Sequence, residues 1–246
     1  MVLLVPIQPN TPSPSELKLE SGRVIRYVAP PNANPNSHAG QDDVPSVVLR
    51  KNSLRFDQFS DWEGVNDVCH TLDSIVEIDM ETDFFDGKTV LEIGFTTGLP
   101  AVYAYENGAS EVALHCQSKP VLDLYCKPTL KRNNIPANKC KFSYGNLDDL
   151  PKALGGKKFD IILAPDLLNR SESDYEQLHD IINEAMAEGG ICLFSSYTYY
   201  SSSDGSLDSF LSLVRAHRQF DSIERWSSPK TDIVQRKVYQ LTRSFI

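Results

Sequence analysis

The fold is decided by the stretch Val90-Leu-Glu-Ile-Gly-Phe-Thr-Thr-Gly-Leu99, in which a hydrophobic run passes through a glycine turn into a helical pattern. Gly94 permits the sharp turn that ends a strand, and Gly98 lets the backbone approach a ligand at a helix N-terminus. The spacing of these glycines departs from the G-x-G-x-x-G dinucleotide pattern, and no P-loop lysine follows. The stretch therefore predicts a ligand-binding turn or, alternatively, an ordinary strand–helix turn with two glycines.

Strand patterns alternate with helix patterns from residue 88 onward. Apolar runs predict strands at 89–93, 111–115, 141–144, 159–164, 190–196, 221–226 and 234–242. Helical periods, with glycine or proline near their ends, predict helices at 99–107, 120–133, 172–187 and 207–217. This alternation indicates an α/β fold, in which right-handed crossovers build a parallel sheet covered by helices on both faces.

The region before residue 88 is less regular. Residues 1–22 are rich in proline, serine and threonine and predict a polar tail, 23–28 predicts a short strand, and 29–45 predicts a loop. Short edge strands are expected at 47–49 and 54–56, and 62–78 has the apolar stripe of an amphipathic helix. We therefore expect an N-terminal tail and loop with one short strand over 1–46, followed by a single α/β domain over 47–246.

The net charge of −9 is unevenly distributed. Residues 57–86 contain ten acidic residues and no lysine or arginine. An acidic chain is not expected to bind nucleic acid as its main partner, because phosphate binding needs a basic face. The acidic segment has two interpretations: a solvated helix face, or a surface that attracts a basic protein partner and loses that attraction in salt.

The cysteines and the hydropathy pattern indicate the cellular compartment in which the protein is expected. The five cysteines form no C-x-x-C pair, and an odd number leaves one thiol over in any disulfide scheme. The histidines show no spacing typical of a metal site, and no apolar run approaches the roughly 20 residues that cross a bilayer. We expect an intracellular protein with no bound metal and no membrane association.

The motifs together resemble the seven-strand S-adenosylmethionine (SAM)-dependent methyltransferases. Their first motif reads acid-x-Gly-x-Gly-x-Gly and is matched here by Glu92-Ile-Gly94-Phe-Thr96-Thr-Gly98. The closest likeness is to the eukaryotic protein-histidine methyltransferases that modify a protein of the large ribosomal subunit. It extends over residues 54–243 and includes Trp62-Glu63-Gly64, the run at 159–163 followed by an acid, Gly189-Gly190, and the tyrosine- and serine-rich segment 197–205. The resemblance implies a Rossmann-like seven-stranded methyltransferase sheet with SAM as cofactor.

Carried over residue by residue, the resemblance also implies a cofactor site. It would be formed by Val68, Cys69, Glu92, Gly94, Phe95, Thr96, Gly98, Cys116, Gln117, Ser118, Gly145, Asn146, Leu147 and Ala164. Several positions depart from the family pattern. Thr96 replaces a glycine and would crowd the cofactor, Cys116 replaces the acid that accepts the ribose hydroxyls, and Leu147 replaces an aromatic residue beside the adenine. Gln117 and Asn146 retain acceptors that partly compensate.

Two polar residues after the strand at 159–164 are candidate catalytic residues. Asp166 follows that strand directly, where the carboxyl edge of a parallel sheet faces a ligand. A carboxylate there could fix the tautomer of a histidine acceptor, which is mostly neutral at pH 7 and needs little deprotonation. Asn169 stands where related enzymes often have an aromatic residue that shapes the substrate slot. The alternative for Asp166 is a helix cap or a loop acid.

The sequence therefore predicts a SAM-dependent protein methyltransferase that modifies histidine in a basic, ribosomal-class protein. A monomer in the cytoplasm and nucleus is expected. Two alternatives stay open: a methyltransferase-like pseudoenzyme that binds a protein partner, and a protein-lysine methyltransferase of the same superfamily. A Rossmann oxidoreductase is the least favoured interpretation, because the glycine spacing is wrong and no acid ends the second strand.

Overall fold

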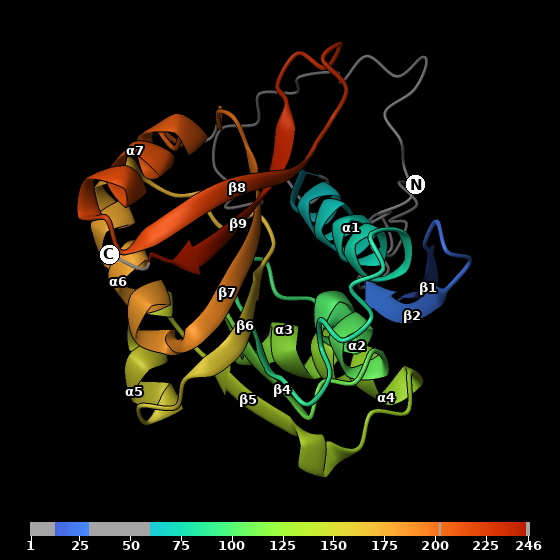
Figure 1. The fold of residues 1–246 in the computed structure, drawn as a ribbon. Coiled ribbons are helices and arrows are strands. Elements are labelled where there is room, and N and C mark those ends of the chain that lie inside the picture. Colours follow the sequence, from blue (N-terminus) through green and yellow to red (C-terminus); the bar gives the residue numbers. More distant parts are fainter. Residues whose placement is uncertain (1–12, 30–59, 202, 245–246) are drawn as a thin grey trace, which may run out of the picture.

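The computed structural model of the chain describes residues 13–29, 60–201 and 203–244. Its centre is a seven-stranded sheet (Figure 1). The strands lie in the order β5 (Cys140–Tyr144), β4 (Glu111–Cys116), β3 (Thr89–Glu92), β6 (Phe159–Ala164), β7 (Met186–Tyr197), β9 (Arg236–Arg243) and β8 (Phe220–Ser227). The prediction of a seven-stranded, Rossmann-like α/β sheet is confirmed.

The sheet is mixed and not wholly parallel. Strands β5, β4, β3, β6 and β7 are parallel, whereas β9 is antiparallel to both of its neighbours, β7 and β8. The expectation of a purely parallel sheet was wrong at this edge. Strands β8 and β9 follow one another through a short connection, and a short connection can join only antiparallel neighbours.

Helices cover both faces of the sheet, as predicted (Figure 1). One core layer packs with α1 (Ser60–Asp73), its π-helical continuation η1 (Ser74–Ile78), α2 (Leu99–Glu106) and the continuous run α3 (Lys119–Val121), η2 (Leu122–Cys126) and α4 (Lys127–Arg132). The opposite layer packs with α5 (Leu150–Leu154), α6 (Tyr175–Ala185) and α7 (Leu207–His217). Three 3-10 turns, η3 (Ala137–Lys139), η4 (Leu147–Asp149) and η5 (Glu172–Asp174), complete the connections.

A two-stranded hairpin precedes α1 in the chain. Strand β1 (Ser13–Lys18) pairs antiparallel with β2 (Val24–Ala29), so the expected polar tail over 1–22 was wrong for residues 13–18. The hairpin is held in place because it buries Leu17, Ile25 and Tyr27, and the Tyr27 ring packs tilted against that of Trp62, with the ring centroids 5.5 Å apart. The strands expected at 47–49 and 54–56, and the boundary between 46 and 47, lie outside the described residues.

The acidic segment does not present a simple solvated face. Five of its carboxylates form ion pairs with three arginines from distant parts of the chain. The pairs are Glu77 with Arg23, Asp79 and Glu81 with Arg225, and Glu63 and Asp67 with Arg236. Asp73, 1% exposed, accepts hydrogen bonds from Ser21 and Tyr103. The segment therefore helps to join the hairpin, α1 and the last two strands.

None of the helices within the described ranges is long and apolar enough to cross a membrane. The five cysteines are all buried and all free. No group of three or more histidine, cysteine, aspartate or glutamate side chains in the described part of the chain could hold a metal ion.

Candidate functional site

The glycine turn between β3 and α2 lies against the end of β6. Gly94 has φ +76°, and a Cβ there would lie 2.4 Å from the Pro165 carbonyl oxygen, so only glycine fits. The next amide, Phe95 N–H, donates to that same carbonyl at 2.7 Å. The turn therefore packs directly against Pro165, the residue that precedes Asp166.

Glu92 holds the turn in place from within. Its carboxylate accepts hydrogen bonds from the amides of Thr97 (2.7 Å), Gly98 (2.8 Å) and Ala101 (3.0 Å). Burial raises the pKa of Glu92 to about 7, and the three amide donors act in the opposite direction. The first-motif acid therefore binds the N-terminus of α2, which is a preferred place for negative charge.

Thr96 is turned into the protein. Its hydroxyl donates to the main-chain carbonyl of His115 at 2.7 Å, and the residue is only 6% exposed. Thr96 is not among the residues that line the cavity described below. The threonine instead ties the glycine turn to the end of β4.

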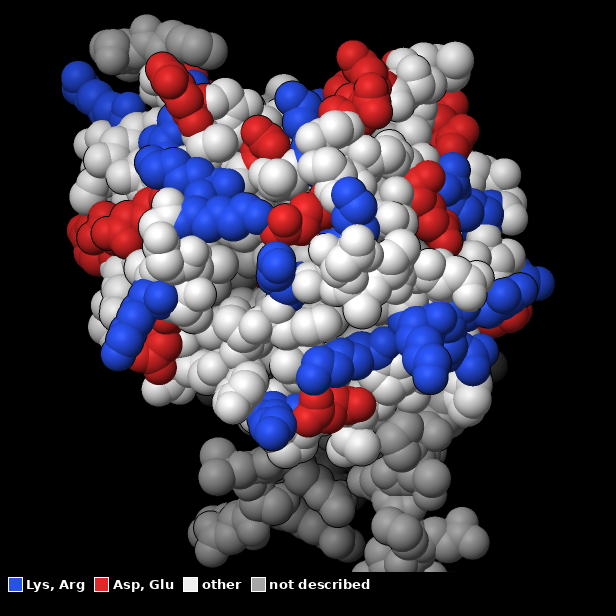
Figure 2. Space-filling model, turned by 90° about the horizontal axis from the view of Figure 1, so that it is seen from below, with Lys and Arg blue, Asp and Glu red and all other residues white. Residues whose placement is uncertain are grey.

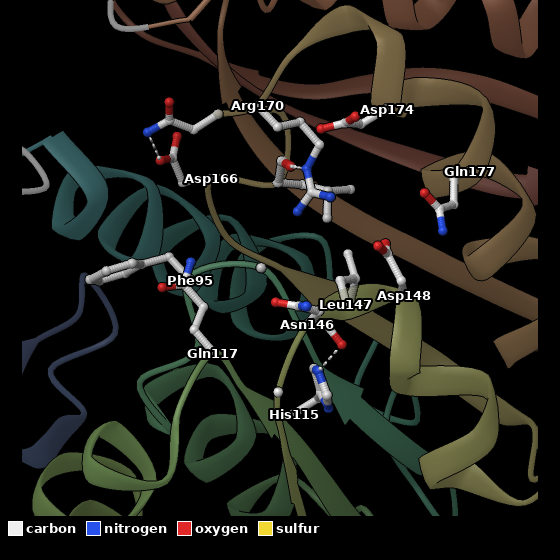
Figure 3. Close-up of a pocket in the computed structure, with 14 residues that line it drawn as sticks. Phe95, His115, Gln117, Asn146, Leu147, Asp148, Asp166, Arg170, Asp174 and Gln177 are labelled. Atoms are coloured by element: carbon white, nitrogen blue, oxygen red, sulfur yellow. Dashed lines mark hydrogen bonds between the residues drawn. The ribbon is translucent and has the colours of Figure 1, made fainter. Parts of the chain in front are cut away.

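A cavity of about 420 Å³ opens beside this turn (Figure 3). Eight of the sequence-predicted site residues line it: Gly94, Phe95, Gln117, Gly145, Asn146, Leu147, Asp166 and Asn169. They come from the segments that follow β3, β4, β5 and β6. The carboxyl ends of four parallel strands thus converge on one cavity, where ligands bind in open α/β sheets.

The other eight predicted residues do not line the cavity. Glu92, Thr96 and Gly98 build the turn. Val68, Cys69 and Ala164 are buried in the core. The Cys116 thiol is also fully buried, with its Sγ 3.4 Å from that of Cys126, and Ser118 caps α3. Strand β4 ends at Cys116, and the next residue, Gln117, lines the cavity.

Asp166 is held in an unusual conformation at the edge of this cavity. Its φ of +47° lies in the left-handed region, which is uncommon for a residue other than glycine, and it is 7% exposed. Its amide donates to Ser195 Oγ at 3.0 Å, and its carboxylate accepts from Tyr200 Oη at 2.6 Å and Asn169 Nδ2 at 3.2 Å. Strained residues of this kind cluster at functional sites.

Six further residues line the cavity and were not predicted: His115, Asp148, Leu167, Arg170, Asp174 and Gln177. His115 ends the second strand pattern and could have been found with its neighbours Cys116 and Gln117. Its two ring nitrogens lie 2.8 Å from Ser143 Oγ and 3.2 Å from the Asn146 carbonyl, and burial lowers its pKa. His115 is therefore a neutral ring that joins β4 to β5.

Arg170 brings the one guanidinium among the cavity-lining residues. Its Nε donates to the Leu167 carbonyl at 3.3 Å, and its side chain points into the cavity (Figure 3). Burial lowers its pKa, while the charges of Asp174 and Asp148 raise it. With Asp148, Asp166 and Asp174, the cavity contains three carboxylates against one guanidinium, so its charge favours a ligand that carries positive charge.

A second polar cluster lies between α1 and the sheet. Arg236 pairs with Asp67 at 2.8 Å and with Glu63 at 3.3 Å, and Tyr197 donates a hydrogen bond to Glu63. Burial raises the pKa of Asp67 to about 6, against the effect of Arg236. Gly64 lies beside this cluster, and its carbonyl accepts from Ser195, the residue that also holds the Asp166 amide.

The fold is that of the SAM-dependent methyltransferases. A Streptococcus mutans protein assigned to these enzymes matches with a TM-score of 0.58 and 15% identity, over 94% of this chain and 56% of that one. An O-methyltransferase from Bacillus cereus, solved in complex with S-adenosylhomocysteine (SAH), matches with a TM-score of 0.51 and 13% identity, over 70% of this chain and 90% of that one. At these identities the likeness shows the fold.

The chain belongs to the same protein family as F22B7.9, an uncharacterized protein of Caenorhabditis elegans. The two are 58% identical over 245 residues, which cover 99% of each chain. A histidine protein methyltransferase 1 homolog from Dictyostelium discoideum is 33% identical over 129 residues, or 52% of this chain. The match spans 41% of that longer protein. No protein-family model matches the chain.

Proposed function

We propose that this protein is a SAM-dependent methyltransferase that acts on a protein. One observation carries the proposal: the Glu92-held glycine turn and the strained Asp166 meet at a single cavity formed by the carboxyl ends of four parallel strands. The cavity also has the acceptors and the net negative charge that suit a sulfonium cofactor. The fold of the structural neighbours supports the same assignment.

The residues that would hold SAM fit the polar parts of that molecule. Gly94 and Phe95 would contact its amino-acid arm. The side-chain carbonyl oxygen of Gln117 would accept a hydrogen bond from a ribose hydroxyl, in place of the family's acid. Gly145 has φ +133°, and a Cβ there would lie 3.6 Å from Asp149 Oδ2, while the side-chain carbonyl of Asn146 and the Leu147 side chain would contact the adenine. When bound, SAM supplies an electrophilic methyl group on its sulfur.

The protein's own contribution to transfer would be alignment and exclusion of water. Asp166 and Asn169 line the same cavity and are hydrogen-bonded to each other. A carboxylate that accepts one imidazole N–H fixes the tautomer, so that the other ring nitrogen carries the lone pair that attacks the methyl group. We therefore propose histidine as the acceptor. The name of the Dictyostelium relative supports this choice over the part of the chain that it matches.

Calorimetric titration of the wild-type protein with SAM and with SAH tests the cofactor assignment. We expect saturable binding of both ligands at micromolar concentrations. No heat at high micromolar ligand would overturn the proposal. Transfer is then tested with methyl-tritiated SAM and a ribosome-rich extract. Amino-acid analysis of the labelled protein separates methylhistidine from methyllysine, and labelled lysine would favour the lysine-methylating alternative.

A methyltransferase-like pseudoenzyme is the second candidate. It is favoured by Cys116 and Leu147, which leave the ribose site without its acid and the adenine site without an aromatic ring. This alternative predicts that the wild-type protein captures a protein partner equally well with and without SAH, and transfers no methyl group. Labelling of any extract protein by the wild-type enzyme would exclude it.

We also propose a basic protein substrate, met in the cytoplasm and nucleus by a monomeric enzyme. The three cavity carboxylates support a cationic partner. The acidic segment 57–86 gives less support than its composition suggests, because five of its acids are paired with arginines. Basic and acidic side chains are also interspersed on the face in Figure 2. An association rate that does not change with salt would contradict electrostatic attraction.

A further inference from the structure

The segment that follows β7 packs against the cavity residues that follow Asp166. The Tyr200 amide donates to the Gly205 carbonyl at 3.1 Å, and Tyr199 and Ser206 form a β-bridge. A Cβ on Gly205 would lie 2.6 Å from the Leu168 carbonyl oxygen and 2.7 Å from that of Arg170. The backbone of this segment therefore packs directly against the residues that follow Asp166. This contact places one tyrosine of the segment inside the protein.

That tyrosine, Tyr200, is 5% exposed and ends at the Asp166 carboxylate. Its hydroxyl lies 2.6 Å from Asp166 Oδ1, 3.2 Å from Ser196 Oγ and 3.2 Å from the Tyr197 amide nitrogen. The Tyr197 amide is a donor, so the hydroxyl accepts from it and donates its own proton to the nearest acceptor, the carboxylate. Burial raises the pKa of Tyr200 well above its usual value, so the phenol keeps this proton at neutral pH.

Asp166 is thus constrained at three points. Ser195 holds its amide, Tyr200 holds one carboxylate oxygen and Asn169 holds the other. The Ser195 hydroxyl is in turn oriented by the Gly64 carbonyl at 2.8 Å, where a Cβ on Gly64 would lie 2.8 Å from Ser195 Oγ.

We propose that Tyr200 is a positioning residue for methyl transfer, which acts through Asp166. This inference rests on the proposed function, in which Asp166 orients the acceptor side chain. The hydrogen bond from Tyr200 is a charge-assisted bond in a buried site, and such bonds are among the strongest that a side chain makes. Without the hydroxyl, the carboxylate keeps its charge but loses the contact that fixes its direction, and the acceptor ring is aligned less well.

The test compares Tyr200→Phe with Tyr175→Phe. Tyr175 is a matched control because it is equally buried and its hydroxyl bonds elsewhere: it donates to the Leu168 carbonyl and accepts from the Ser206 amide. Both variants lose one buried hydroxyl and keep the ring. We expect similar losses of thermal stability, and SAH affinity within about twofold of wild type in both.

The rate of transfer separates the two variants. With methyl-tritiated SAM and a ribosome-rich extract, Tyr200→Phe should lower the maximal rate by about tenfold or more with little change in the apparent KM for SAM. Tyr175→Phe should stay near the wild-type rate. Equal rates in the two variants, whether both high or both low, would overturn the positioning role. A wild-type protein that binds no SAH would overturn the proposed function itself.

Discussion

The hydroxyl of Thr96 donates a 2.7 Å hydrogen bond to the main-chain carbonyl of His115. This bond joins the glycine turn after β3 to the end of β4, and His115 in turn contacts the Asn146 carbonyl after β5. Three of the strand ends that form the cavity are therefore tied together by side-chain to main-chain hydrogen bonds. Thr96, which stands where the resembled motif has a glycine, therefore links two of these strand ends.

Replacing Thr96 by glycine should weaken the site. The variant loses a buried hydrogen bond, worth about 1 kcal/mol, and gains backbone freedom that costs roughly 1 kcal/mol more on folding. We expect a lower free energy of unfolding in urea and weaker SAH binding. Thr96→Ser keeps the hydroxyl and should lie close to wild type. Tighter SAH binding by Thr96→Gly would show that the threonine does crowd the cofactor.

Replacing Cys116 by aspartate, the acid expected from the family motif, should strongly destabilise the protein. The Cys116 side chain is fully buried, and its Sγ lies 3.4 Å from that of Cys126, a neighbour that cannot balance the charge of a carboxylate. An unpaired buried charge costs about 3–5 kcal/mol. Gln117→Asp is the informative comparison, because position 117 lines the cavity. Urea unfolding should show a large loss for Cys116→Asp and a small one for Gln117→Asp.

Gly94→Ala separates a steric contact from backbone strain. Gly94 and Gly87 both have positive φ angles, +76° and +69°, so alanine is strained at either position. Only at Gly94 would the added Cβ collide, 2.4 Å from the Pro165 carbonyl oxygen, since nothing lies within 4 Å at Gly87. Gly87→Ala should cost about 1–2 kcal/mol and retain SAH binding. Gly94→Ala should cost more and abolish binding; equal effects would contradict the contact.

The sequence predicted those features that depend on local pattern. The strand–glycine–helix stretch at 90–99 placed β3, the turn and α2, and the position of Asp166 after an apolar run placed it at the cavity. Each of these follows from chain direction alone, because successive parallel strands end at the same sheet edge. The hairpin strand β1 was missed because Leu17 is its one aliphatic residue, and a single apolar residue gives no period.

Other features of the site depend on contacts between distant residues. Tyr200 reaches Asp166, Ser195 reaches Gly64, and Arg236 reaches Asp67 across separations of 34, 131 and 169 positions. The periodicity of a single sequence does not indicate which distant residues form such pairs. The sequence also does not show the direction of a side chain at a strand end: Cys116 and Gln117 were both predicted to bind the cofactor, and of the two only Gln117 lines the cavity.

The buried His179 of α6, which lies beside His217 of α7, should make the protein sensitive to acid. His179 is fully buried, and neither of its ring nitrogens has a hydrogen-bond partner within the described part of the chain. Its ring centroid lies 4.5 Å from that of His217 and 5.2 Å from that of Phe220, while Asp180 Oδ1 is 3.7 Å from Nδ1. Burial lowers the pKa of His179, the charge of His217 lowers it further, and Asp180 and Glu176 act in the opposite direction.

The sign of the pH effect follows from this lowered pKa. The folded protein holds His179 neutral, whereas the unfolded chain takes up a proton near its usual pKa of about 6.5. The unfolded state therefore binds more protons as the pH falls below about 6.5, and the free energy of unfolding decreases. His179→Phe keeps a ring of similar shape and removes the titrating group. The free energy of unfolding of this variant should be at least equal to that of wild type near pH 7.5 and higher than that of wild type near pH 5. Parallel stability curves for the two proteins across that range would contradict this role for His179.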